Sequence, residues 1–150
     1  MERNEFIKSL GLGVAMVCTG ACFSACGKKS DSPEPDKPNG GGIPSGTSTK
    51  VDLSTQLLTI GASMVVNSIL FIRTAAGNTA SSFVATQAAC PHQGGALSFI
   101  QASNYIQCGL HSSRYTTSGS ILAQPSDGGT TSALKIYPIT IAGNILTATA

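Results

Sequence analysis

Charge is scarce in this chain. Only 11% of its 150 residues are charged, and nine Lys and Arg against seven Asp and Glu leave a formal net charge of +2. A protein that binds nucleic acid through phosphate contacts needs a basic patch or stripe, which so few charges do not supply. Nucleic-acid binding is therefore excluded as its function.

Long hydrophobic runs are missing from most of the sequence. After position 25, no uninterrupted apolar stretch reaches the roughly eighteen residues that a transmembrane helix needs. Catalytic acids are also few, since residues 50–150 contain only Asp52 and Asp127, which lie far apart in the sequence. We expect neither a membrane-spanning helix in the mature protein nor a carboxylate pair for glycoside hydrolysis.

The first residues are typical of an export signal. Arg3 and Lys8 precede a short apolar stretch of mostly small residues at 10–25, and such a pattern predicts a signal peptide rather than a fold element. Phe23-Ser24-Ala25-Cys26, followed by Gly27-Lys28-Lys29, resembles a bacterial lipobox. We predict that residues 1–25 are removed and that a lipid on Cys26 anchors the protein to a membrane, facing the periplasm or cell exterior.

The residues leave two features of this signal undecided: the processing or lipidation site and the export route. Cys22, within Thr19-Gly20-Ala21-Cys22, is a second lipidation candidate, and an uncleaved N-terminal anchor is the alternative to processing. The segment from Arg3 to Lys8 also resembles a twin-arginine signal in which Asn4 stands in place of the second arginine. Twin-arginine export and Sec export are both compatible with these residues.

Residues 26–49 have the composition of a linker. They contain four prolines, the run Gly40-Gly41-Gly42 and many charges, so they cannot bury enough apolar surface to fold. Alternating stiff proline segments and loose glycine segments would let this tether hold a domain some distance from a membrane.

Residues 50–150 show short β-type runs separated by turn signals. Three hairpins are predicted: 67–74 with 82–86 around Gly77-Asn78, 97–100 with 105–107 around Ser103-Asn104, and 134–141 with 145–149 around Gly143-Asn144. No segment has sustained helical periodicity. We expect an all-β domain, an antiparallel β-sandwich or partly open barrel.

Two short motifs contain both histidines of the chain. Cys90-Pro91-His92 is followed, after fifteen residues, by Cys108-Gly109-Leu110-His111. Thiolates and imidazoles bind zinc, copper and iron–sulfur centres, so ligand type alone does not choose the metal. A mononuclear zinc site and a plain Cys90–Cys108 disulfide are the alternatives, but the spacing of the motifs favours a [2Fe–2S] cluster held by two cysteines and two histidines.

These motifs resemble those of the Rieske family of iron–sulfur proteins. The resemblance covers roughly residues 63–149 and includes Cys90-Pro91-His92-Gln93-Gly94 and the segment 108–115. Gly119 lies where the family usually has a glycine, and Pro125 lies where its third, proline-containing loop covers the cluster. The expected fold is thus Rieske-like, with a cluster-binding subdomain of two loops.

The resemblance implies a role for each motif residue. Cys90 and Cys108 would bind the inner iron, and His92 and His111 the outer iron. Ser113 and Tyr115 match residues that, in the quinol-oxidising branch, donate hydrogen bonds to a bridging sulfide and a cysteine sulfur, respectively. Such bonds stabilise the reduced cluster, so we expect a potential above the floor of the range of about −150 to +300 mV.

The sequence also departs from the family pattern. Quinol-oxidising members carry one further cysteine in each motif, joined as a disulfide, and these positions are Gly95 and Leu110 here. Ser112 stands where glycine is usual, and Gln93 replaces a leucine used in docking at a quinone pocket. The disulfide cannot form, and whether quinol is a substrate stays open.

The predicted function is one-electron transfer by a membrane-tethered Rieske protein to a redox protein or membrane oxidoreductase. The alternative is an electron-transfer subunit of a quinol-oxidising complex or a molybdenum enzyme. With both histidines assigned to metal, no imidazole remains as a base for a Ser or Cys nucleophile. We therefore expect an electron carrier rather than a catalyst by itself.

Overall fold

The computed structural model describes residues 43–150. The predicted signal peptide, both lipidation candidates and the linker up to residue 42 lie outside the described residues. Within residues 43–150, no helix is long and apolar enough to span a membrane.

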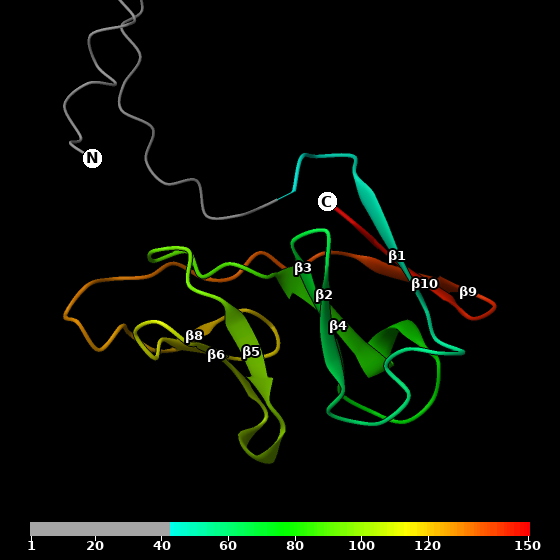
Figure 1. The fold of residues 1–150 in the computed structure, drawn as a ribbon, viewed down its shortest axis with the longest axis horizontal. Helices are drawn as coiled ribbons and strands as arrows, with labels where there is room; N and C mark the ends of the chain where they lie inside the picture. Colours follow the sequence, from blue (N-terminus) through cyan, green and yellow to red (C-terminus); the bar gives the residue numbers. More distant parts are fainter. Residues whose placement is uncertain (1–42) are drawn as a thin grey trace, which may run out of the picture. The chain divides into compact units, whose positions relative to one another are not determined.

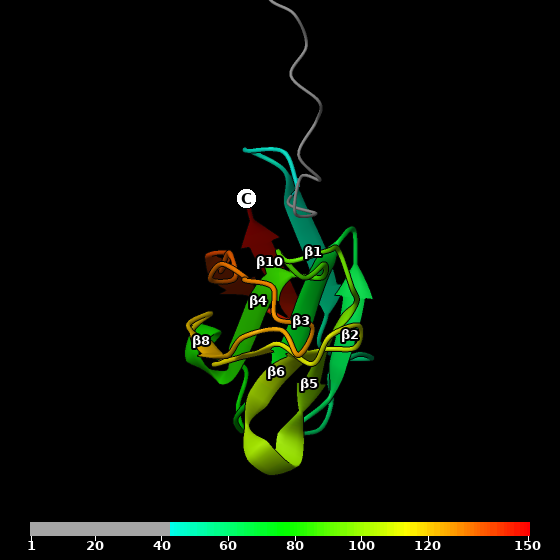
Figure 2. The ribbon, with the colours of Figure 1, turned by 90° about the vertical axis from the view of Figure 1, so that its left-hand side faces the viewer.

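The described chain forms three antiparallel sheets (Figures 1 and 2). Their strand orders are β1-β10-β9, β2-β3-β4 and β5-β6-β7-β8. Residues 43–150 contain no α-helix, only two short 3-10 turns. The strands are β1 (Ser48–Asp52), β2 (Ser63–Val66), β3 (Ile69–Arg73), β4 (Phe83–Gln87), β5 (Leu97–Ile100), β6 (Tyr105–Cys108), β7 (Arg114–Tyr115), β8 (Ile121–Ala123), β9 (Ile139–Ala142) and β10 (Ile145–Thr149), and the turns are η2 (Ala80–Ser82) and η3 (Gln101–Ser103). The prediction of an all-β class is confirmed.

The predicted hairpins are present, with small changes at their ends. β3 pairs with β4, β5 with β6 and β9 with β10, each antiparallel. Asn104 closes the β5–β6 turn in the left-handed conformation (φ 51°), which Asn tolerates better than most residues. Strand β9 begins only at Ile139, because Leu134 and Ile136 precede it in a segment that is bonded to β4 but forms only an isolated bridge with it, Thr86 to Ile136, rather than a strand.

Strand β3 separates two hydrophobic cores, since all five of its residues are buried. Successive side chains of a strand point to opposite faces. Ile69 and Phe71 accordingly pack into a core with β1, β4 and β10, whereas Leu70 and Ile72 pack into a second core. This second core comprises Leu70, Ile72, Cys90, Leu97, Ile106, Cys108, Tyr115 and Leu134.

The second core lies beneath the two Cys/His loops. The sheet β5–β8 packs on one side of β2–β4, and β1, β9 and β10 pack on the other (Figure 1). Residues 88–96 connect β4 to β5, and residues 109–113 connect β6 to β7. Both loops thus start from buried strand ends, which fixes the position of each cysteine.

Candidate metal centre

The two Cys/His loops share one backbone frame. The amide of Cys90 donates to the carbonyl of Gly95 (2.8 Å), and the amide of Cys108 donates to that of Ser113 (2.9 Å). Four residues after each cysteine, the chain enters the left-handed region, at Gly94 (φ 72°) and Ser112 (φ 57°). Ser112 is therefore the counterpart of Gly94, and its position explains why a glycine is favoured there.

The loops are also in direct contact with each other. The amide of Gly109 donates to the carbonyl of Ala96 (2.9 Å). A Cβ placed on Gly95 would lie 2.7 Å from Cys108 Sγ and 2.7 Å from Leu110 Cβ. The structure thus brings Gly95 and Leu110 side by side, and hydrogen bonding and close packing join the loops at positions where these residue types exclude a disulfide.

The sulfur side of the site is fully enclosed. Cys90 and Cys108 are free thiols with relative exposures of 0% and 2%. The Tyr115 hydroxyl lies 3.2 Å from Cys90 Sγ and 2.6 Å from Thr131 Oγ1. Burial raises the pKa of Tyr115 to about 12, so the hydroxyl keeps its proton and can donate it to the sulfur.

The same contacts act on the thiol. Burial opposes ionisation of Cys90, but hydrogen bonding from the Tyr115 hydroxyl and the further bonds around the sulfur outweigh it, and the pKa of Cys90 is lowered. A lowered pKa favours the thiolate, which is the form that binds metal.

Ser113 carries a buried hydroxyl that lacks a partner. Its side chain is 0% exposed, and Ser113 Oγ makes no hydrogen bond to any described residue. A buried polar group of this kind is normally satisfied, because leaving it unpaired costs about 1–3 kcal/mol. Ser113 Oγ is thus available to a group held between the two loops.

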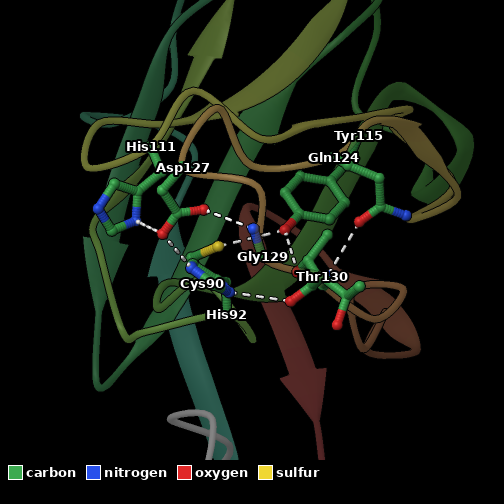
Figure 3. A network of polar contacts seen from close by, with 9 residues as sticks. Cys90, His92, His111, Tyr115, Gln124, Asp127, Gly129 and Thr130 are labelled. Atoms are coloured by element: carbon green, nitrogen blue, oxygen red, sulfur yellow. Dashed lines mark hydrogen bonds and ion pairs between the residues drawn. The ribbon is translucent and has the colours of Figure 1, made fainter.

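The imidazole side faces solvent. The rings of His92 and His111 have their centroids 5.2 Å apart and are inclined at 74°. Their side chains are 10% and 25% exposed, respectively. Figure 3 shows the carboxylate of Asp127 between the two rings. Asp127 Oδ2 lies 2.9 Å from His92 Nε2, in a hydrogen bond, and 3.4 Å from His111 Nδ1.

This carboxylate and the His92 ring shift each other's pKa. Hydrogen bonding to Asp127 raises the pKa of His92, and hydrogen bonding from His92 in turn lowers the pKa of Asp127. Nδ1 of His92 also has a partner, the carbonyl of Thr130 at 2.9 Å. Both ring nitrogens of His92 therefore contact the segment that carries Asp127 and Thr130.

Asp127 belongs to a third loop, residues 124–131, which lies against both motifs. The amide of Ser126 donates to the carbonyl of His111 (2.8 Å), and Pro125 is buried. Gly129 lies against the His92 ring so closely that an added Cβ would overlap Cε1 of His92. Pro125 is where the sequence predicted a covering loop, but sequence reasoning missed the roles of Asp127, Gly129, Thr130 and Thr131.

The side chains present fit a [2Fe–2S] cluster. Two thiols and two imidazoles form separate pairs, one buried and one at the surface, as a cluster with two cysteines on one iron and two histidines on the other requires. Ser113 Oγ adds a donor without a partner in the protein. A single-ion site of two thiolates and two imidazoles matches less well, because among residues 43–150 the potential ligands whose donor atoms lie within 4.8 Å of one another are His92, His111 and Asp127, without either cysteine.

Comparisons with known proteins agree with this assignment. The family model described as the Rieske [2Fe–2S] domain matches residues 43–138, which is more than half of the chain. No curated protein matches the chain significantly in sequence.

Solved structures that resemble the chain include the following two. One is the plasma membrane Rieske protein PetC3 from the cyanobacterium Synechocystis PCC 6803, with 19% identity and a TM-score of 0.53, covering 68% of this chain and 99% of that chain. The other is provisionally described as the small subunit of an NADPH nitrite reductase; it has 18% identity and a TM-score of 0.44, covering 69% of this chain and 99% of that chain. The similarity to PetC3 supports the fold alone at this identity, and the similarity to the second structure is too low to support an inference.

Proposed function

The chain belongs to the Rieske [2Fe–2S] domain family, and from this membership together with the sequence of residues 1–49 we propose that it is a membrane-tethered one-electron carrier. It is an iron–sulfur electron-transfer protein whose cofactor is a [2Fe–2S] cluster. The proposal covers the residues that hold the cluster, the site of membrane attachment and the redox partner.

One observation carries the proposed ligand set: the enclosed thiol pair opposite the partly exposed imidazole pair. We assign Cys90 and Cys108 to the inner iron and His92 and His111 to the outer iron. The cluster supplies a reversible one-electron centre. Tyr115 donates a hydrogen bond to Cys90 Sγ, the second core excludes water from the sulfurs, and the partly exposed imidazoles give a redox partner its closest approach.

The tether rests on residues 1–49. A lipid on Cys26 would hold the domain at a membrane, and the linker up to residue 49 would give it reach. Separation of membranes from soluble extract tests this: wild type should sediment with membranes and Cys26→Ser should not, with Cys22→Ser as the matched control. If Cys26→Ser still sediments with membranes and Cys22→Ser does not, the lipid is on Cys22 instead.

The expected partner is a redox protein or a membrane oxidoreductase. Leu110 is 55% exposed next to His111, so an apolar contact can form at the cluster end. Gentle solubilisation should release a monomer if the protein is a free carrier. A stable larger assembly would favour the alternative, an electron-transfer subunit of an oxidoreductase complex.

Low-temperature EPR with a redox titration tests the proposed centre directly. Purified wild type should show a Rieske signal, and His92→Ala and His111→Ala should each abolish it, because every ligand is needed to retain the cluster. Survival of the signal in both variants would overturn the ligand assignment. A bound single metal ion without that signal in wild type would contradict the proposal as a whole.

A further inference from the structure

The 124–131 loop places the only carboxylate of the site against its histidines. Figure 3 shows Asp127 between the His92 and His111 rings. Its Oδ2 atom approaches ring nitrogens of both, at 2.9 Å and 3.4 Å. Asp127 is one of only two acidic residues in positions 43–150, and it is the acidic side chain that contacts the imidazoles.

The loop holds this carboxylate in place. Asp127 Oδ1 accepts a hydrogen bond from the amide of Gly129 (3.0 Å), so the second oxygen is left to face the rings. The neighbouring amide of Ser126 is bonded to the carbonyl of His111, which ties the loop to the second motif. These backbone hydrogen bonds therefore hold the Asp127 carboxylate in one orientation toward the rings.

His92 would keep a partner on this loop when it binds iron. A metal-ligating histidine uses one ring nitrogen, and the other normally donates its N–H to a carboxylate, carbonyl or water. Here Nε2 faces Asp127 and Nδ1 faces the Thr130 carbonyl. If Nδ1 binds iron, Nε2 keeps the Asp127 carboxylate as its acceptor. If Nε2 binds iron, Nδ1 keeps the Thr130 carbonyl, and Asp127 acts through its charge alone.

We propose that Asp127 is a positioning residue that orients the imidazole ligands and lowers the reduction potential of the cluster. The inference rests on the proposed ligand set. A negative charge beside the outer iron disfavours an added electron. An imidazole that donates to a carboxylate is also a stronger electron donor to the metal. Both effects oppose the upward tuning expected from Ser113 and Tyr115.

Potentiometric titration of the cluster-loaded protein, followed by EPR, tests this role. Asp127→Asn removes the charge and keeps the shape, and should raise the midpoint by the equivalent of roughly tenfold in the equilibrium constant for reduction, which is about 59 mV for one electron. Asp127→Glu should restore most of the wild-type value. Asp52→Asn is the matched control and should leave the midpoint unchanged, because Asp52 is bonded to Ser54 at the end of β1.

Each remaining outcome is decisive. A wild-type midpoint in Asp127→Asn would overturn the proposed tuning. Loss of the cluster in Asp127→Asn, with Asp127→Glu still loaded, would show that the carboxylate is needed to hold the cluster, and this too would overturn it. Absence of a Rieske signal from wild type would refute the proposed function instead, so the two failures are distinguishable.

Discussion

The sulfur side and the imidazole side of the centre are built in different ways. Cys90, Cys108, Tyr115 and Ser113 are almost completely buried and belong to, or lie against, a packed core. His92 and His111 lie at the surface and are held by hydrogen bonds and contacts from one loop. A packed core tolerates little change in volume, whereas a surface loop can shift. The sulfur side should therefore be destabilised by added atoms, whereas the imidazole side should accommodate them by a shift of its loop.

The two sides should also act on the potential in opposite directions. Hydrogen bonds to the sulfurs stabilise the reduced state, and they come from the buried side. The carboxylate that opposes them comes from the exposed side. If this division holds, the potential reflects a balance that can be altered from either side independently.

The largest effect should come from adding one methyl group on the sulfur side. Gly95→Ala would place a Cβ 2.7 Å from both Cys108 Sγ and Leu110 Cβ. Overpacking of this kind costs about 1–3 kcal/mol of the free energy of unfolding, and the displaced thiol should lower iron content. Gly109→Ala is the matched control, because its Cβ would meet only the Ala96 carbonyl at 3.7 Å. Equal iron content and stability in both variants would contradict a rigid sulfur side.

Removal of the tyrosine hydroxyl should have the next largest effect. Tyr115→Phe loses the bonds to Cys90 Sγ and Thr131 Oγ1 and should destabilise the domain by about 1–2 kcal/mol while lowering the midpoint potential. Thermal unfolding and redox titration measure the two effects. Tyr137→Phe is the control, since the buried Tyr137 hydroxyl has no partner among the described residues. The prediction fails if the two variants have the same midpoint.

Ser113→Ala should change the stability of the domain without the cluster and the midpoint potential with it. Without the cluster, the variant removes an unsatisfied buried hydroxyl and should stabilise the domain by about 1 kcal/mol. With the cluster, it should lower the midpoint potential. Thr49→Val is the matched control, because Thr49 Oγ1 is also buried and unpaired among residues 43–150 but lies in β1. If Ser113→Ala and Thr49→Val respond alike to cluster loading, Ser113 does not contact the cluster.

The smallest effect should come from the corresponding methyl group on the imidazole side. The Cβ of Gly129→Ala would overlap the His92 ring, which lies at the surface and can move with its loop. We expect the cluster to be retained, the stability to fall by less than about 1 kcal/mol and the EPR g-values to shift. A loss of iron as large as that in Gly95→Ala would remove the contrast between the two sides.

Local patterns made the fold and much of the site predictable. Alternating β-branched runs around Asn and Gly turns located the three hairpins, and the spacing of Cys90, His92, Cys108 and His111 located the two loops. The third loop was harder, because Asp127 reaches His92 across 35 positions of sequence and no local pattern marks it. The scarcity of acidic residues was the available signal. Asp127 follows Pro125 by two residues and is one of only two acids in residues 50–150, which marks it as a candidate site residue.

The direct contact between the Cys/His loops has a consequence for where the domain can mature. Among the described residues, the loops are joined by the bond from Gly109 to Ala96 and by the packing of Gly95 against Leu110, not by a covalent bridge. No oxidant is required to join the two loops. The domain could therefore fold and take up its cluster in a reducing compartment and then be exported to an oxidising one without disulfide formation. Dithiothreitol should accordingly leave its melting temperature and midpoint unchanged, and a drop in either would show that a hidden thiol linkage contributes.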